Sequence, residues 1–164
     1  MYYPEAKMAD LWGKTLDTIT GATHGSALIT FRFSDGSEYQ MVHREDCCER
    51  VRVEDISGDW SDIIGHPLLL SDESSNCTDP PVAEEYNDSW TWTFYRFGTR
   101  RGYVTIRWYG TSNGYYSERV SLECVQPADG LPPEPEKPAA VAPAGVGHGG
   151  YFSLAPGRSV QGAE

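Results

Sequence analysis

The chain has 164 residues, of which 39% are hydrophobic and 12% aromatic, and its formal net charge is −11. Binding of nucleic acid depends on lysine and arginine side chains that neutralise phosphates, so this charge argues against DNA or RNA as a partner. It also disfavours anionic membranes, and no apolar run approaches the ~20 residues that span a bilayer. The length allows one domain with extensions, and ten Tyr and five Trp favour strands over helices.

The first residues, 1–7, carry no apolar pattern and are predicted to form a flexible leader. They lack a basic start followed by an apolar block, so we expect no secretory signal and cysteines that are reduced thiols in a cytosol. Two stretches are predicted as short helical turns that end at a glycine, "MADLWG" (8–13) and "GDWSDIIG" (58–65).

The rest of the chain up to residue 126 alternates apolar and polar residues with the period of strands. Asp35-Gly36 predicts a hairpin between 26–33 and 37–44, and a second hairpin is expected between 89–97 and 101–110. Further strands are expected at 50–56 and 117–125. We therefore predict a mostly β domain over 8–126, a compact antiparallel sandwich or barrel-like sheet of about eight strands.

Two pairs of short signatures suggest an internal repeat. "DLWGKTL" (10–16) and "DIIGHPL" (62–68) share D-x-x-G-x-x-L, whereas "CERVRVED" (48–55) and "SERVSLEC" (117–124) share E-R-V-x-(V/L)-E. The order predicts two four-stranded units, each made of a turn, a strand, a hairpin and a closing strand. The second unit would be longer by an insertion over 73–88.

Residues 127–164 are rich in Pro, Gly and Ala and show no periodicity. Such a segment buries too little apolar surface to offset the entropy of ordering it, so it is predicted to be a disordered tail. One alternative role for the protein follows from this tail: a structural, virion-associated protein that docks through the apolar cluster Tyr151, Phe152 and Leu154.

The segment "HREDCCER" (43–50) gathers a histidine, acids and two adjacent cysteines. Zinc sites use cysteine pairs spaced by two to four residues together with a second pair elsewhere, and neither is present, so no metal or cofactor is predicted. Neighbours on a strand point to opposite faces, and a disulfide between them would be strained. We favour a structural corner with one cysteine buried. A small metal- or thiol-dependent enzyme built on His43, Asp46, Cys47, Cys48 and Glu49 is the alternative.

The segment "RWYGTSNGYYSER" (107–119) is the best candidate for a recognition loop. Asn113-Gly114 predicts a tight turn, and aromatic and arginine side chains are typical of binding surfaces. By alternation, core packing should take about half of these aromatics. The predicted ligand- or partner-binding residues are Arg107, Trp108, Tyr109, Asn113, Tyr115 and Tyr116, joined by His43, Asp46 and Glu49 because the repeat places the two loops at related positions.

Three blocks, "H-x-x-D-C-C-E", "E-D-I-x-G-D" and "G-Y-V-x-I-R-W-Y-G-x-S-N-G-Y-Y-S", resemble a family of small domains of unknown function associated with bacteriophage and some bacterial genomes. The resemblance covers roughly residues 8–125 and implies a viral setting. We therefore expect a phage-encoded accessory protein in the cytoplasm of the infected bacterial host. It would be a non-enzymatic module that binds a host protein, a phage protein or a small ligand, and the sequence leaves its oligomeric state open.

Overall fold

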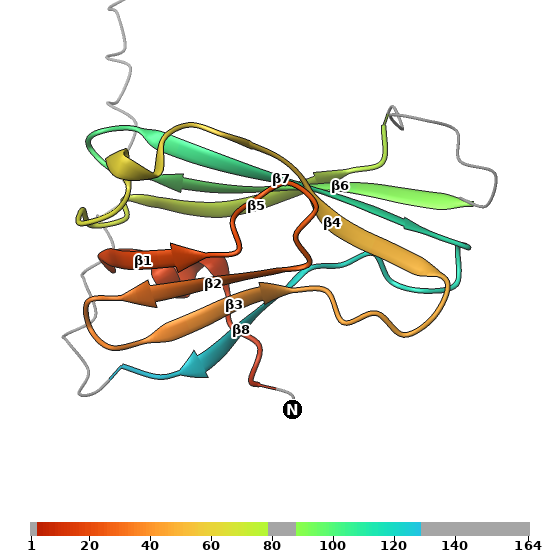
Figure 1. Cartoon of the computed structure of the whole chain (residues 1–164), viewed down its shortest axis with the longest axis horizontal. Coiled ribbons are helices and arrows are strands. Elements are labelled where there is room, and N and C mark those ends of the chain that lie inside the picture. Colours follow the sequence, from red (N-terminus) through yellow and green to blue (C-terminus); the bar gives the residue numbers. More distant parts are fainter. Residues whose placement is uncertain (1–2, 79–87, 129–164) are drawn as a thin grey trace, which may run out of the picture.

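The computed structural model describes residues 3–78 and 88–128, and they form two antiparallel sheets packed face to face (Figure 1). In spatial order, the first sheet contains β1 (Leu16–Thr20), β2 (Leu28–Phe33), β3 (Glu38–Val42) and β8 (Ser121–Gln126). The second contains β4 (Glu49–Ser57), β7 (Tyr103–Ser112), β6 (Ser89–Gly98) and β5 (Leu70–Asn76). The sandwich prediction is confirmed, and the described strands do not close into a barrel.

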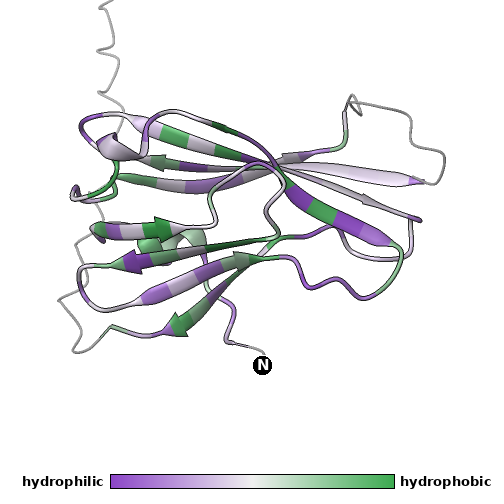
Figure 2. Cartoon of the chain, viewed as in Figure 1, coloured by the Kyte–Doolittle hydropathy of each residue, from purple (hydrophilic) through white to green (hydrophobic). Residues whose placement is uncertain are grey.

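Alternation of side chains determines which face of each strand is buried. Along β4 the hydrophobic and hydrophilic residues follow one another, as the colours of Figure 2 show, and Val51 and Val53 point inward. The two inner faces meet in one hydrophobic core. Phe31 of the first sheet stacks on Phe97 of the second, with ring centroids 5.3 Å apart. Stacked rings bury a large apolar area, so this contact joins the two layers at their centre.

Each half of the chain builds three neighbouring strands of one sheet and sends its fourth strand to the other. Strand β8, from the second half, completes the sheet of β1, β2 and β3. Strand β4, from the first half, completes the sheet of β5, β6 and β7. Consequently β3 pairs with β8 and β7 pairs with β4, both antiparallel. The two halves thus follow the same path through the sandwich. Because each half contributes its fourth strand to the sheet of the other, backbone hydrogen bonds between strands hold the two halves together.

The first repeat signature lies where the two halves touch. The Gly13 N–H donates to the carbonyl of Leu68 at 2.8 Å, and the Gly65 N–H donates to the carbonyl of Leu16 at the same distance. Thr15 and Pro67, which hold matching positions in the two signatures, form an antiparallel bridge. Such reciprocal contacts are what a duplicated unit would produce about a local two-fold axis. The duplication itself stays a prediction.

The predicted turns are present as two short 3-10 helices, η1 (Met8–Leu11) and η2 (Trp60–Asp62). The hairpin at Asp35-Gly36 is confirmed between β2 and β3, and the second hairpin joins β6 to β7. The predicted insertion was placed too early, because residues 73–76 belong to β5. Residues 129–164, which carry most of the predicted tail, lie outside the described residues.

Part of the predicted leader packs on the domain. The Ala6 N–H donates to the carbonyl of Leu122 at 2.7 Å, and the Cys124 N–H donates to the carbonyl of Pro4 at 2.9 Å. These bonds lie along the edge of the first sheet at β8, so the stretch around Ala6 is not a loose leader. It covers an edge whose N–H and C=O groups would otherwise be unpaired.

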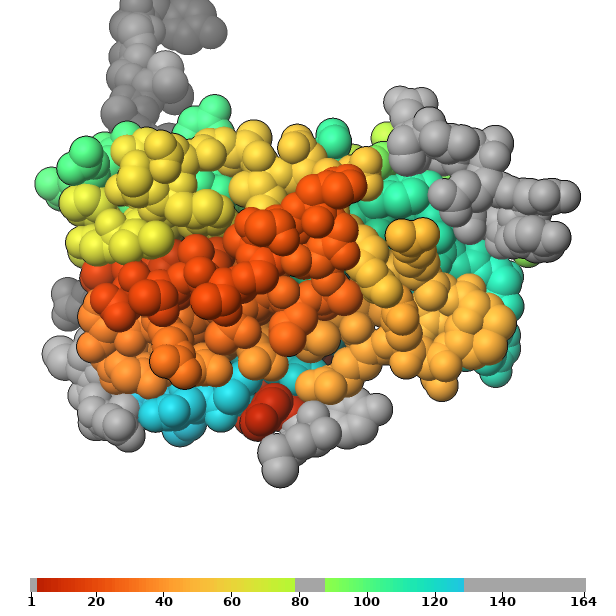
Figure 3. Space-filling model, viewed as in Figure 1, coloured from red at the N-terminus to blue at the C-terminus, as the bar shows by residue number. Residues whose placement is uncertain are grey.

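The connection between β1 and β2 also contacts the second sheet. It forms hydrogen bonds with β4, from Gly25 N to the Val53 carbonyl at 2.7 Å and from Val53 N to the Ser26 carbonyl at 2.9 Å. Figure 3 shows this orange-red segment lying across the junction of the two sheets on the viewed face. In the described parts of the chain, no helix is long and apolar enough to cross a membrane.

Candidate functional site: a rim of two loops

The segment 43–48 is the connection along which the chain leaves the first sheet and enters the second. His43 is buried, and its Nδ1 lies 2.8 Å from the carbonyl oxygen of Arg119. Because a carbonyl oxygen only accepts, Nδ1 carries the proton of this bond. Arg44 forms a bidentate pair with the buried Glu123 of β8, at 2.9 and 2.6 Å. The two contacts fix the start of the corner to β8 and to the segment that precedes it.

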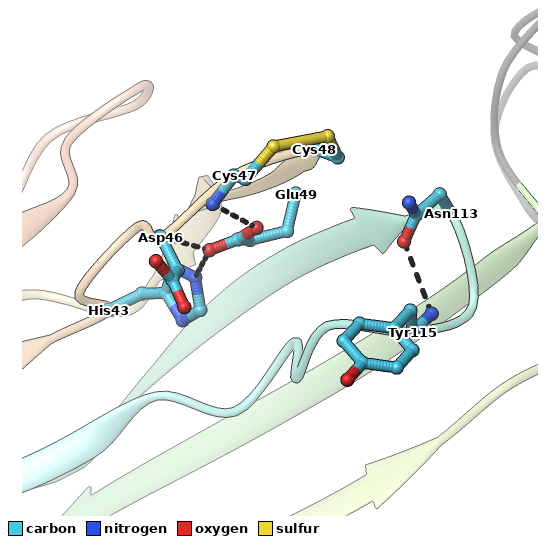
Figure 4. Close-up of a disulfide and its surroundings, with 7 residues drawn as sticks. All are labelled: His43, Asp46, Cys47, Cys48, Glu49, Asn113 and Tyr115. Atoms are coloured by element: carbon cyan, nitrogen blue, oxygen red, sulfur yellow. Dashed lines mark hydrogen bonds and ion pairs between the residues drawn. A yellow bond between two sulfur atoms is a disulfide. The ribbon is translucent and has the colours of Figure 1, made fainter.

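The side chain of Glu49 folds back under this corner and binds its backbone. Its side chain is only 2% exposed, and its carboxylate accepts hydrogen bonds from the backbone N–H groups of Asp46 and Cys47 (Figure 4). Its Oε1 also lies 3.6 Å from Nε2 of His43, which is longer than a hydrogen bond. The backbone hydrogen bond from Asp46, partly opposed by burial and helped by Cys47 and His43, lowers the pKa of Glu49 below its ordinary 4.5.

The two cysteines differ from both predictions made for them, which were reduced thiols and one buried side chain. Cys47 and Cys48 are both exposed and are joined to each other in a disulfide, so neither is a buried small hydrophobe. The pair sits in the corner and not in a regular strand, and Cys48 has a φ of 54°. The backbone can therefore bring the two sulfur atoms together. In this form neither sulfur is a thiol that could act as a nucleophile.

The second loop, residues 113–117, connects β7 to the segment that leads into β8. The Asn113 side-chain oxygen accepts a hydrogen bond from the Tyr115 N–H at 3.1 Å, which is the local bonding expected of a turn (Figure 4). Tyr115 is 85% exposed, and its ring meets that of Tyr116 edge to face with centroids 5.1 Å apart. The turn thus presents an aromatic side chain to solvent on a hydrogen-bonded backbone.

The structure brings these two loops together. Glu49 pairs with Ser112 at the end of the β4–β7 ladder, and the Asn113 N–H donates to the Cys48 carbonyl at 3.3 Å. Each loop connects the third strand of its half to the crossing fourth strand. We call residues 43–48 and 113–117 the rim. The rim contains Asp46, Asn113, Tyr115 and Tyr116 on its surface and His43 beneath.

Three of the predicted recognition residues lie elsewhere. Trp108 is completely buried in the core, so it cannot contact a partner. Arg107 and Tyr109 point to the outer face of the second sheet, where the Arg107 guanidinium lies 5.1 Å from the centre of the Trp92 ring. The rings of Trp92 and Tyr109 are 4.4 Å apart. Alternation along β7 therefore divides the predicted aromatic segment between the core and the outer sheet face.

Sequence analysis missed Glu118, which holds the position of Glu49 in the second copy of the E-R-V-x-(V/L)-E signature. Glu118 is buried, and its carboxylate accepts a hydrogen bond from the Ser112 hydroxyl at 2.8 Å, which in turn accepts the Gly114 N–H at 3.1 Å. Both glutamates thus support the loop that precedes them. The signal was present in the repeated E-R-V-x-(V/L)-E, whose first residue is the glutamate in each copy.

The arrangement provides a surface that two loops form. Over residues 3–78 and 88–128, no three His, Cys, Asp or Glu side chains are grouped so that they could hold a metal ion. The free cysteines of this part of the chain lie outside the rim: Cys77 directly follows β5, and Cys124 belongs to β8. What the rim offers is an exposed aromatic ring, backbone groups and a carboxylate on a scaffold fixed by buried hydrogen bonds.

A two-sheet sandwich with a loop rim is an architecture that many unrelated binding proteins use, so it defines a structural class and not an activity. Residues 9–122 match the family model of DUF7448, a domain of unknown function, and the chain belongs to this family. No curated protein and no solved structure matches the chain significantly.

The cysteine geometry leads to a first prediction. Cys47→Ser and Cys48→Ser should each change the free energy of unfolding by less than about 0.5 kcal/mol, because both positions are exposed. Reduction should also leave the melting temperature nearly unchanged, since a bond between neighbours constrains almost no loop in the unfolded chain. Calorimetry with and without a reductant measures this. A large loss for one variant only would place that sulfur in the core.

Thiol titration of the denatured protein checks the bond itself. Cys77 and Cys124 should react before reduction, and all four cysteines of the chain should react after it. Four reactive thiols in protein purified without reductant would contradict the disulfide.

The lowered pKa of Glu49 gives a second prediction. A carboxylate whose folded pKa lies below its unfolded value stabilises the fold above about pH 4.5 and loses this contribution as the pH falls through the folded pKa. The amide protons of Asp46 and Cys47 should therefore become less protected in acid. Hydrogen exchange followed by NMR between pH 7 and pH 3 measures this loss.

Glu49→Gln keeps the size of the side chain and should abolish this pH dependence at Asp46 and Cys47. The Ser61 amide is an internal control, because it donates to Asp59, whose pKa that hydrogen bond also lowers. Its acid response should be the same in both proteins. Unchanged behaviour of Asp46 in the variant would show that Glu49 does not hold the corner.

Proposed function

We propose that the protein is a non-enzymatic binding module that engages a host protein through the rim. The observation that carries the proposal is Tyr115, an almost fully exposed aromatic side chain on a turn fixed by hydrogen bonds. Tyrosine provides a large amphipathic contact area at a low cost in conformational entropy, which is why it is enriched in binding loops. A rigid support reduces that cost further.

Two features support a protein partner at this end of the molecule. Three buried side chains, those of His43, Glu49 and Glu118, support the rim through hydrogen bonds that pre-organise the two loops before a partner binds. Its surface carries a carboxylate at Asp46 and backbone groups as well as an aromatic ring, and mixed aromatic and polar composition is typical of recognition surfaces. The charge of −11 disfavours nucleic acid and anionic lipid in this role.

We further propose that the protein is encoded by a bacteriophage and acts in the cytoplasm of the infected bacterial host. The sequence blocks around residues 43–49 and 101–117 support this setting through the family they resemble. We also propose that the domain arose by duplication of a four-stranded unit, which would explain why both rim loops precede a buried glutamate and a crossing strand.

An affinity experiment on extracts of the bacterial host tests the rim. Tyr115→Ala removes the exposed ring, and Tyr103→Ala is the matched control, because Tyr103 is also exposed (68%) but lies at the start of β7, opposite its rim end. Proteins retained by each immobilised chain are quantified by mass spectrometry. We expect a host protein that the wild type and Tyr103→Ala retain equally and that Tyr115→Ala loses at least tenfold. Equal retention by all three chains would overturn the proposal.

A further inference from the structure

A polar cavity of about 350 Å³ lies between β5, β6 and the segment 117–120 that leads into β8. It is separate from the outer surface of the rim, although Ser117 and the residues after it form one of its walls. The volume falls within the range of sites that hold small molecules. The side chains that give it its chemistry are Glu73, Ser75, Thr91, Thr93, Ser117 and Glu118.

The cavity exists because the second sheet is longer than the first. Strands β6 and β7 have ten residues each, whereas β3 has five and β8 has six, so one end of the second sheet extends past its partner (Figure 1). Glu73 pairs with Tyr95 and Ser75 pairs with Thr93, and Tyr95 is a core residue, so all four share the inner face. Inner faces of sandwiches are normally apolar, and this end is not.

One of these polar side chains has no hydrogen-bond partner within the described residues and lines the cavity. Thr93 is 9% exposed, and among the residues that the structure describes no hydrogen bond to its hydroxyl is formed. Its neighbours are satisfied: the Tyr95 hydroxyl donates to the Val120 carbonyl at 3.1 Å, and the Glu118 carboxylate accepts from Ser112. The hydroxyl can therefore form a hydrogen bond with a group that occupies the cavity.

The charges around the cavity favour a cation. Glu73 and Glu118 line it, and Arg119, the one basic side chain among the described residues of its wall, is paired with Glu5 at 2.5 Å. Burial raises the pKa of the Tyr95 hydroxyl, and the negative charges of Glu73 and Glu5 raise it further against the opposing effect of Arg119. A net negative field in a partly enclosed site attracts positive charge more strongly than the same field in open water.

We propose that this cavity is a binding site for a small organic cation of the alkylammonium class. Ammonium N–H groups would donate to the carboxylates of Glu73 and Glu118 and to the hydroxyl oxygen of Thr93, all of which accept hydrogen bonds. The carbon chain would lie between Thr91 and the buried Val120. The site does not depend on the rim function, since Tyr115 is not among its lining residues.

Titration calorimetry of the full chain tests the site with 1,4-diaminobutane as the probe. Its neutral analogue 1,4-butanediol has the same carbon chain with hydroxyls in place of the ammonium groups. We expect the diamine to bind with one-to-one stoichiometry and the diol to bind at least tenfold more weakly. Equal affinities would overturn the proposal in favour of a site for polyols, and the absence of binding by the diamine would overturn it altogether.

Matched variants separate the cavity from the general acidity of the protein. Glu73→Gln should weaken diamine binding about tenfold, the loss expected for one charged hydrogen bond. Asp72→Asn makes the same change of net charge at the neighbouring residue. Asp72 pairs with Arg96 on the outer face of the sheet, so this variant should bind the diamine with unchanged affinity. Equal losses in both variants would mean that the diamine binds diffusely and that the cavity is not a site.

Thr93→Val provides a readout that does not depend on charge. Valine has nearly the shape of threonine without the hydroxyl, so the melting temperature of the free protein should stay about the same, because the hydroxyl forms no hydrogen bond within the described residues. The affinity for 1,4-diaminobutane should nevertheless fall severalfold. Unchanged affinity would remove Thr93 from the site, and the observation that supports a built pocket would be lost with it.

Discussion

Trp108→Ala is expected to lower the free energy of unfolding by about 3–5 kcal/mol, the range measured when a large aromatic side chain is removed from a core. Trp108 is completely buried in β7, between Val53 of β4 and Thr93 of β6 in the pairing of the second sheet. It is the largest of the fully buried side chains in the described residues, and its loss leaves a cavity that the strands on both sides hold open. Urea denaturation followed by circular dichroism measures the change.

Two further variants make this test specific. Trp108→Phe should cost much less, about 1–2 kcal/mol, because it keeps an aromatic ring and removes an indole N–H that has no hydrogen-bond partner within the described residues. Tyr115→Ala, on the exposed turn, should stay within about 0.5 kcal/mol of the wild type. A loss below about 1 kcal/mol for Trp108→Ala would mean that the indole is not part of the core.

Gly21→Ala is expected to destabilise the protein by about 2–4 kcal/mol. Gly21 has a φ of 77°, which costs an L-residue roughly 1–2 kcal/mol, and the new Cβ would lie 2.3 Å from the backbone carbonyl oxygen of Leu28. That oxygen belongs to the first residue of β2, so relief of the clash would require the strand to move, and overpacking of this kind adds roughly 1–3 kcal/mol.

Gly25→Ala is the matched control for Gly21→Ala. Gly25 lies in the same connection and has nearly the same φ of 79°, but an added Cβ would meet no atom within 4 Å. It should therefore cost only the conformational penalty, about 1 kcal/mol. The difference between the two variants measures the close approach of the β1–β2 connection, at Gly21, to the start of β2. Equal melting temperatures for the two would show that this approach does not occur.

Local signals in the sequence were sufficient for much of the fold. Asp35-Gly36 located the first hairpin, because a turn with positive φ strongly prefers glycine, and Gly36 has a φ of 82°. The buried alternation in β4 located a strand whose inward valines are now in the core. Strand β5 was harder to find. Its segment "LSDESSN" has almost no apolar residues, since its inner face lines the polar cavity and not the core.

The candidate site could be predicted only in part, because its parts meet through tertiary contacts. The predicted repeat put residues 43–49 and 107–117 at related positions, and in the structure a hydrogen bond between Asn113 and Cys48 joins the two loops. Alternation alone could not say which of Trp108 and Tyr109 faces the core. The disulfide of Cys47 and Cys48 depends on the left-handed backbone at Cys48, which no sequence pattern specified.

The exchange of fourth strands has a consequence for how the chain folds. Strand β3 ends at Val42, and its pairing partner β8 begins only at Ser121, so the first sheet cannot be completed until nearly the whole domain has been synthesised. Pairing across such a distance carries a large loop-closure entropy, and proteins dominated by non-local pairs fold slowly. A chain stopped after β4 would expose the unpaired edges of β3 and β4 together. Folding of the two sheets is therefore coupled, and neither half is an independent folding unit.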